Sequence, residues 1–228
     1  MPPSIVTTKL QVPRLCANFT ARSRLTTQID GGLDQMLTLI SAPAGFGKTM
    51  LLAEWASRHP YPVGWFSLDT NENQPSLFWL HFIAALQLIA PGLDALLPSS
   101  CADGSESPLQ PLLTTLINEI ARLPFTVVIA LDNYHLIENQ EIHNSIAFLL
   151  ENHPVNLHLL LASRSDPPLP LPRLRARGQM SEIRTEDLRF SHAETTEFLN
   201  GAHGYQLSSP QIASLHAATE GWIDPKNS

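Results

Sequence analysis

One stretch of this sequence, residues 41–49, carries residue types that could bind phosphate groups. It has the sequence Ser-Ala-Pro-Ala-Gly-Phe-Gly-Lys-Thr, and it lies between an apolar run at 36–40 and a helical pattern at 50–56. A strand, a glycine-containing loop and a helix beginning with Gly-Lys-Thr form the context of a phosphate-binding P-loop. The loop's N–H groups and the positive end of the helix dipole attract anions. The sequence therefore predicts a nucleoside triphosphate site, in preference to an ordinary strand-to-helix turn that contains a lysine.

The residue types in this loop each have a role in that chemistry. Gly45 and Gly47 let the backbone bend and approach the phosphate oxygens, where a Cβ would interfere. We expect Lys48 to reach the β- and γ-phosphates and the Thr49 hydroxyl to ligate Mg²⁺. The usual pattern opens with glycine, whereas this chain has Ala42 there. The residues of the loop and its helix that we expect to contact the nucleotide are Ala44, Gly45, Phe46, Gly47, Lys48, Thr49 and Met50.

An acidic residue follows the strongest strand pattern of the chain. Residues 125–131 are uncharged and rich in β-branched side chains, and they are followed by Asp132 and Asn133. Ligands of parallel sheets gather at the carboxyl ends of the strands, and a carboxylate there can hold Mg²⁺. We therefore expect Asp132 to ligate the metal together with Thr49. Without the P-loop, this aspartate would be interpreted as the first residue of a loop.

A further strand pattern at 156–162 brings Arg164 to the same edge of the sheet. An arginine there can contact a γ-phosphate, although a surface ion pair fits the spacing nearly as well. The elements that must position these residues follow from the pattern of apolar residues. Strands are predicted at 36–40, 62–68, 125–131, 156–162 and 180–184, and helices at 76–90, 109–120, 139–151, 191–200 and 208–217.

The segments outside these elements suggest how the chain is organised. Residues 91–108 are predicted to be an exposed loop, and the proline-rich stretch 166–172 an extended connector. Ser191 and Glu194 form a capping box, which marks a helix start. The segment before the first strand could fold back over the nucleotide base, although a solvated arm fits it equally well. We divide the chain into an N-terminal arm (1–35), a core (36–188) and the start of a helical or winged-helix subdomain (189–228).

Composition narrows the class of protein. The chain has 228 residues and 43% hydrophobic residues, which allows a sizeable core. Its 21 acidic and 14 basic residues give a net charge of −7, so direct nucleic-acid binding is not expected, because phosphate neutralisation needs a basic face. The two cysteines, Cys16 and Cys101, look like ordinary thiols of a reducing compartment. None of the nine histidines has a partner at metal-ligand spacing, so no zinc site is expected.

Targeting signals are not evident in the sequence. The N-terminus lacks a basic segment followed by an apolar core, so we do not interpret it as a signal peptide. The most apolar stretch, 77–90, is too short to span a bilayer. The expectation is a soluble cytoplasmic protein without membrane contact.

Nine short motifs occur in order along nearly the whole chain, at 8–10, 22–25, 41–49, 65–69, 131–136, 162–168, 174–178, 187–190 and 219–222. In these motifs the chain resembles the N-terminal nucleotidase module of the MalT-like branch of large LuxR-type transcription activators. These proteins are signal-transduction ATPases with numerous domains, the STAND class. The ordered set is far more specific than the P-loop alone.

The resemblance implies the fold and part of the site. The fold would be a P-loop NTPase with a five-stranded parallel sheet flanked by helices, in which the Arg164 strand lies between the P-loop strand and the Asp132 strand. Thr20 to Arg22 would line the adenine pocket, and Arg164 would sense the γ-phosphate. Family members continue with a winged-helix element, a sensor that binds an inducer and a DNA-binding helix-turn-helix. We expect this chain to be a fragment that lacks these parts and does not bind DNA specifically.

Two positions depart from the family pattern. Asn133 stands where members usually have a second acid that polarises the attacking water. An amide can hold a water molecule but cannot take its proton. Glu72 replaces an expected aspartate in the loop after the second strand, which leaves open whether Glu72 acts as the base.

Three functions are consistent with these residues. In the first, ATP with Mg²⁺ holds an active, self-associating form of a transcription activator, and slow hydrolysis to ADP resets it. In the second, the chain is a stand-alone P-loop ATPase or phosphotransferase with substantial turnover. In the third, it is an interaction module that keeps nucleotide as a structural ligand without hydrolysis. We favour the first, in which the chain is a weak ATPase.

Overall fold

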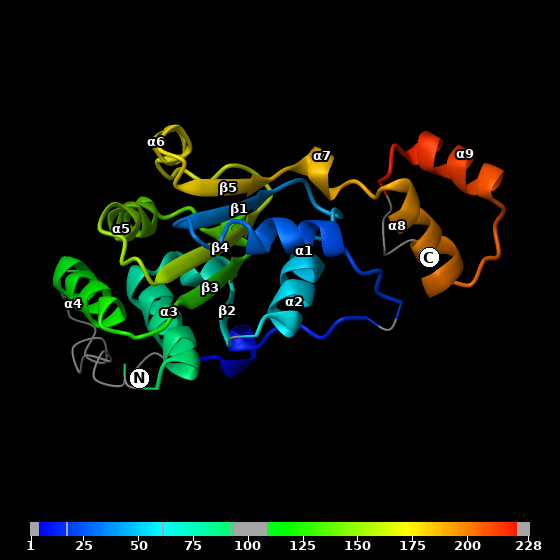
Figure 1. The fold of residues 1–228 in the computed structure, drawn as a ribbon. Coiled ribbons are helices and arrows are strands. Elements are labelled where there is room, and N and C mark those ends of the chain that lie inside the picture. The colour runs from blue at the N-terminus through cyan, green and yellow to red at the C-terminus, as the bar shows by residue number, and fades with distance from the viewer. Residues whose placement is uncertain (1–4, 17, 61, 92, 94–108, 223–228) are drawn as a thin grey trace.

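A computed structural model describes residues 5–16, 18–60, 62–91, 93 and 109–222. Within these ranges, five parallel strands form one sheet in the order β2-β3-β4-β1-β5. The α/β class is as predicted, and β4 lies between β1 and β3 as the resemblance implied (Figure 1). The strands are β1 Leu37–Ser41, β2 Val63–Ser67, β3 Val127–Asp132, β4 Leu157–Ser163 and β5 Met180–Ile183.

Helices cover both faces of the sheet. Alternate residues of a strand point to opposite faces, so each strand packs against both layers of helices. In β3, Ile129 and Leu131 pack in a large core with α3, α4 and α5. Val128 and Ala130 pack on the other face, in a smaller core with α1 and α2. The helices are α1 Ser23–Asp30, α2 Lys48–Arg58, α3 Pro75–Ile89, α4 Leu109–Ala121 and α5 Gln140–Glu151.

Helix α3 shows how the sequence pattern determines burial. It is apolar on nearly every side, and Phe78, Trp79 and Phe82 are fully buried between the sheet and the neighbouring helices. Pro75 occupies its first turn, where a missing N–H costs nothing. Neither α3 nor any other helix in the described ranges is long and apolar enough to cross a membrane.

The proline-rich segment after β4 differs from the sequence prediction. The extended connector predicted through residue 172 becomes helical at α6, Leu171–Ala176. Proline is compatible with the first turn of a helix, and burial of Leu171 and Leu174 against the large core stabilises the turn. The loop predicted at 91–108 falls almost entirely outside the described residues.

The C-terminal part contains short helices beyond the end of β5 (Figure 1). They are α7 Thr185–Leu188, α8 His192–Thr196, a π-helical turn Glu197–Ala202 and α9 Ser209–Thr219. The predicted capping box is present, since the Ser191 hydroxyl accepts from the Glu194 N–H and the Glu194 carboxylate accepts from the Ser191 N–H. The division into arm, core and helical subdomain remains a proposal.

Candidate nucleotide site

The P-loop joins β1 to α2 and depends on two glycines with left-handed backbone conformation. Gly45 has φ 86° and Gly47 has φ 71°, a region that is strained for side chains with a Cβ. Ala42 does not lie in that region, and its side chain packs in the smaller core, which explains why alanine is tolerated there. Gly47 caps α2 without a side chain. The first N–H groups of α2 are therefore left for an anion.

Lys48, the first residue of α2, bends back over the loop. Its Nζ donates hydrogen bonds to the carbonyl oxygens of Ala42 at 2.6 Å and Pro43 at 2.7 Å. Burial lowers the pKa of Lys48, and the positive charge of Arg164 lowers it further. An added negative group would oppose both effects, so this position suits a phosphate.

Thr49 and Asp132 meet at the end of the sheet. The Thr49 hydroxyl lies 3.0 and 2.9 Å from the two carboxylate oxygens of Asp132 and donates to them. Burial raises the pKa of Asp132, whose side chain is 2% exposed, and the hydrogen bond from Thr49 opposes that effect. A cation would stabilise this buried carboxylate.

The donor set fits Mg²⁺, which prefers oxygen ligands and completes its shell with water and phosphate. The described residues contain no cluster of three or more His, Cys, Asp or Glu side chains that could hold a metal ion without such help. The Thr49 hydroxyl and the Asp132 carboxylate are the protein ligands that a magnesium site completed by a nucleotide would need.

Asn133 follows Asp132 in a left-handed conformation with φ 62°. Its Nδ2 lies 3.4 Å from Asp132 Oδ2, so the amide is beside the carboxylate that we assign to the metal. The backbone turn directs the next residues, Tyr134–Leu136, into a short 3₁₀ helix, η5. The position where a proton acceptor would be useful therefore holds an amide.

Glu72 does not take over this role. Its side chain is fully buried, and its carboxylate accepts from Lys9 Nζ at 2.6 Å and from the Asp69 N–H at 2.8 Å. The contact with Lys9 ties the N-terminal arm to the turn η2, Thr70–Asn73. The alternative in which Glu72 acts as the base is therefore not supported by its surroundings.

Arg164 follows the last residue of β4, Ser163. Its side chain is exposed, and in the described part of the chain it forms no ion pair. Its positive charge lowers the pKa of Lys48, so the two cations lie near enough to repel each other. Lys48, Thr49, Asp132, Asn133 and Arg164 thus come together at the carboxyl ends of β1, β3 and β4, as the sequence predicted for their elements.

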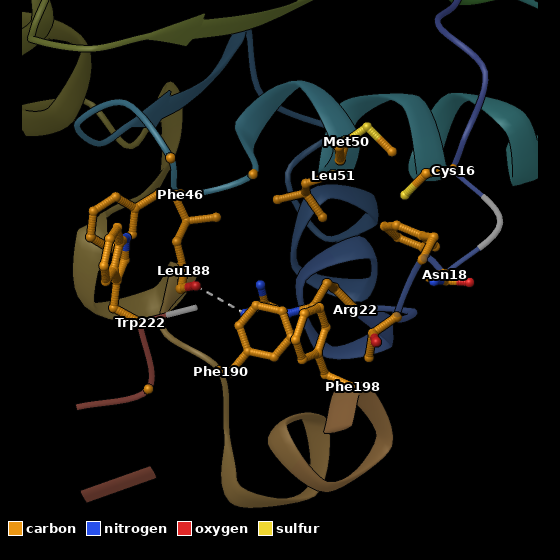
Figure 2. Close-up of a pocket in the computed structure, with 15 residues that line it drawn as sticks. Cys16, Asn18, Arg22, Phe46, Met50, Leu51, Leu188, Phe190, Phe198 and Trp222 are labelled. Atoms are coloured by element: carbon orange, nitrogen blue, oxygen red, sulfur yellow. Dashed lines mark hydrogen bonds between the residues drawn. The ribbon is translucent and has the colours of Figure 1, made fainter. Parts of the chain in front are cut away.

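A cavity that is partly open to solvent lies beside the P-loop (Figure 2). Aromatic and aliphatic side chains form most of its wall, and Thr20 contributes a buried hydroxyl that has no hydrogen-bond partner among the described residues. An apolar slot with few polar groups suits a purine base. The lining residues are Cys16, Asn18, Phe19, Thr20, Arg22, Gly45, Phe46, Gly47, Met50, Leu51, Leu188, Phe190, Phe198, Gly221 and Trp222.

Known proteins with similar sequences identify the group to which the chain is related. No protein-family model matches it. Over 218 residues, 96% of the chain, it is 34% identical to the HTH-type transcriptional regulator MalT of Yersinia enterocolitica. It is 35% identical to MalT of Serratia proteamaculans over the same length. The chain is a homologue of the N-terminal region of MalT. It spans about a quarter of the length of these relatives, 24% in both cases.

A solved structure supports the fold of this MalT-like chain. Cdc6p from Pyrobaculum aerophilum matches it with a TM-score of 0.52 at 14% identity, over 87% of this chain and 52% of that one. At such low identity the likeness concerns the fold alone. The fold is that of a P-loop NTPase.

Arg22 lines the cavity of the MalT-like chain, but its guanidinium is already engaged. It donates to the carbonyl oxygens of Leu188 and Arg189 at 3.1 and 3.0 Å, and to Glu194 Oε1 at 3.0 Å. It also lies 4.2 Å from the centre of the Phe190 ring, close enough for a cation–π contact. Arg22 therefore both lines the cavity and links it to the C-terminal helices through Nε and Nη2.

The backbone of Arg22 forms a second link. Its N–H donates to both carboxylate oxygens of Glu54, at 3.2 and 3.0 Å, and Glu54 is a fully buried residue of the P-loop helix. Arg22 thus connects α2 to the start of the C-terminal part. Thr20 lies two residues away and lines the same cavity as Gly45 and Gly47, so this part of the arm lies beside the P-loop.

The cavity contains residues to which the sequence assigned no role. Phe190, Phe198 and Trp222 come from the C-terminal part, and the Trp222 ring lies 6.4 Å from the ring of Phe46 in the P-loop. Figure 2 shows these two rings together on one side of the cavity. Trp222 belongs to a motif of the family resemblance, which was the available signal. Of the expected nucleotide contacts, Ala44, Lys48 and Thr49 are not in the cavity wall.

Proposed function

We propose that this MalT-like chain binds ATP with Mg²⁺ and hydrolyses it slowly, as the nucleotide-controlled module of a transcription regulator. The observation that carries the proposal is the pair of hydrogen bonds between Thr49 and Asp132 beside the P-loop, at 3.0 and 2.9 Å. A strand-tip carboxylate, a P-loop hydroxyl and a lysine at a helix N-terminus are the groups that hold a metal–triphosphate complex in P-loop proteins.

Different residues of the chain would bind the base, the phosphates and the metal ion. In the proposed complex the base enters the cavity between Thr20, Phe46 and Trp222, and the first N–H groups of α2 receive the inner phosphates. Lys48 exchanges the carbonyls of Ala42 and Pro43 for outer phosphate oxygens. Thr49 and Asp132 hold Mg²⁺, which neutralises charge on the phosphates.

Slow hydrolysis follows from the residue beside the metal position. Asn133 can orient a water molecule through its amide, but it cannot accept the proton that the water loses on attack. Arg164 would stabilise negative charge on the transferred phosphate. ATP should therefore stay bound for a long time before it is hydrolysed. A nucleotide-controlled switch requires this behaviour.

The nucleotide state would reach the rest of the protein through the C-terminal part. Leu188, Phe190 and Trp222 contribute to the cavity wall, so a bound nucleotide would contact the arm, the core and the helical part together. We propose that this arrangement controls self-association and activation of the full-length regulator in the cytoplasm. The inducer sensor and the helix-turn-helix would correspond to the part of the relatives' length that this chain does not span.

Mass spectrometry of ligand released from the purified, denatured protein tests the first step. We expect ATP or ADP, together with Mg²⁺-dependent binding of added ATP in isothermal titration calorimetry. A protein that releases no nucleotide and shows no heat of binding with ATP, ADP or other nucleoside triphosphates would contradict the proposal.

Light scattering after size-exclusion chromatography tests the switch. The full-length regulator should form larger species with a non-hydrolysable ATP analogue than with ADP. The same mass with both nucleotides would leave nucleotide binding intact but exclude control of self-association.

A further inference from the structure

Asn73, the last residue of η2, has a half-buried side chain whose amide joins two distant parts of the chain. Its Oδ1 accepts from the Glu138 N–H at 2.6 Å and from the Asn139 N–H at 3.0 Å. Its Nδ2 donates to the carbonyl oxygens of Leu136 at 2.8 Å and Thr70 at 3.2 Å. Both polar atoms of this side chain are therefore bound, mainly by the segment that follows β3.

The segment after β3 returns one of these bonds. Asn139 is the N-cap of α5, and its Nδ2 donates to the carbonyl oxygen of Asn73 at 2.9 Å. An amide side chain carries an acceptor and two donors in one plane, so it can hold two backbone segments at a fixed separation. We call the hydrogen bonds of Asn73 with Leu136, Glu138 and Asn139 the Asn73 clamp.

The turn between β3 and η5 is held at both of its ends by the loop that follows β2. At the start of the turn, the N–H of Leu68 donates to the carbonyl oxygen of Asp132 at 3.0 Å. At its end, the Asn73 clamp holds Leu136. Between these two points lies Asn133, with its left-handed φ of 62°. Such a conformation costs free energy for a residue with a Cβ and persists only where surrounding contacts maintain it.

The position of Asn133 matters because its amide lies beside the carboxylate that we assign to the metal, with Nδ2 3.4 Å from Asp132 Oδ2. A shift of about 1 Å in a group that orients a reactant can change a rate about 100-fold. The hydrogen bonds of Asn73 reach this turn, the start of α5 and η2, whereas the described lining of the base cavity includes no residue of the loop after β2. The clamp is therefore placed to affect hydrolysis more than binding.

We propose that Asn73 is a positioning residue for ATP hydrolysis. By holding Leu136 and the start of α5, it fixes the turn from which the Asn133 amide orients the attacking water. The inference rests on the proposed function and extends it, because it assigns control of the hydrolysis rate to the loop after β2. Asn73 acts only through the backbone that it holds and does not touch the reacting atoms.

Two measurements on Asn73→Ala test the proposal, both with Mg²⁺: single-turnover hydrolysis of ATP, and titration calorimetry with the non-hydrolysable analogue AMP-PNP. The hydrolysis rate should fall about 10- to 100-fold because the turn loses its fixed position. The affinity for AMP-PNP should stay within about twofold. The same substitution in the Asn133→Asp variant should remove most of the rate gained by that change. Damage to the whole site would instead lower rate and affinity together.

Asn156 offers a matched control. Its Nδ2 also donates to two backbone carbonyl oxygens, those of Ile120 at 2.6 Å and Leu123 at 2.9 Å. It precedes β4, however, and so lies at the amino ends of the strands, opposite to the candidate site. Asn156→Ala should lower thermal stability but leave the hydrolysis rate within about twofold of the wild type. Thermal unfolding without nucleotide shows whether each variant folds.

The outcomes separate the proposed function from the role of Asn73. A wild-type protein that binds no nucleotide, or that binds ATP without hydrolysing it, would contradict the proposed function and this inference with it. If the wild type hydrolyses ATP, an unchanged rate in Asn73→Ala, or an equal fall in rate and affinity, overturns the role of Asn73 alone.

A second variant decides the question if Asn73→Ala does not fold. Asn73→Asp keeps an acceptor for the N–H groups of Glu138 and Asn139 but cannot donate to the carbonyl of Leu136. Its hydrolysis rate should fall while its affinity for AMP-PNP is kept, and an unchanged rate overturns the inference.

Discussion

The hydroxyl of Thr49 donates to both carboxylate oxygens of Asp132, at 3.0 and 2.9 Å, although the two residues are 83 positions apart in the sequence. Thr49 is the second residue of α2, and Asp132 is the last residue of β3. The contact joins the P-loop helix α2 to β3. In the sheet, β3 is separated by β4 from β1, the strand that precedes the P-loop. The atoms that would ligate Mg²⁺ are therefore already adjacent, so ion binding would require little rearrangement.

Lys48→Ala should abolish measurable ATP binding and leave the fold intact. Lys48 supplies the only side-chain charge in the sequence of the P-loop, and among the described residues its Nζ donates to the carbonyls of Ala42 and Pro43. Isothermal titration with ATP and Mg²⁺ measures the loss, and thermal unfolding checks the fold. Arg122→Ala is the control, because the Arg122 side chain is 74% exposed and is distant from Lys48 in the sequence. Unchanged affinity in Lys48→Ala would exclude the P-loop assignment.

Asn133→Asp should raise the rate of ATP hydrolysis and leave ATP affinity nearly unchanged. Aspartate has almost the same shape, tolerates the left-handed conformation at φ 62°, and adds a proton acceptor. General-base assistance is worth about 10²–10⁴-fold in rate, so we expect an increase of at least about tenfold. Single-turnover measurements on both proteins decide the question. Equal rates would mean that Asn133 is not the cause of slow turnover.

Nucleotide binding should change the fluorescence of Trp222. Three of the four tryptophans, Trp55, Trp65 and Trp79, are at most 2% exposed, whereas Trp222 is 42% exposed and lines the cavity. A base that enters beside Phe46 would stack near this indole and alter its emission. Titration of the wild type with ADP should give a saturable change, and Trp222→Phe should lose it. A change of the same size in Trp222→Phe would place the base elsewhere.

His158 should make the protein less stable in mild acid. The ring is fully buried, and burial lowers its pKa from 6.5 to about 4. Between these two values the unfolded chain binds a proton that the folded chain does not, so stability is fully present above pH 6.5 and falls as the pH decreases toward 4. The loss amounts to about 3 kcal/mol.

Urea denaturation at several pH values between 4 and 7.5 measures this dependence. His158→Leu should be less stable at pH 7.5, because the carbonyl of Gln35 loses its partner. Its unfolding free energy should nevertheless depend less on pH than that of the wild type. Parallel pH curves for the two proteins would show that His158 does not cause the dependence.

Local pattern was sufficient for the strands and for the P-loop. The predicted strands at 36–40, 125–131 and 156–162 correspond to β1, β3 and β4 within about two residues. Gly45 and Gly47 have the left-handed conformation that a phosphate-binding turn requires. These features depend on neighbouring residues, because side-chain period and backbone conformation are local properties. The order of the strands needed the family resemblance in addition.

The surroundings of individual side chains could not be obtained in this way. Glu72 was open as a base until the fold buried it against Lys9, 63 positions away. Helix α6 was missed because its proline-rich stretch is helical only where Leu171 and Leu174 can pack on the core.

The sequence by itself determined that this chain has a P-loop between a strand and a helix, and an aspartate at the tip of another strand. Only the tertiary structure decided that Arg22 is engaged with Leu188 and Glu194 and that the Trp222 ring lies beside Phe46 of the P-loop. The physical reason is distance along the chain. Arg22 and Glu194 are 172 positions apart, and contacts of that kind depend on how the elements pack, which no local pattern of residues records.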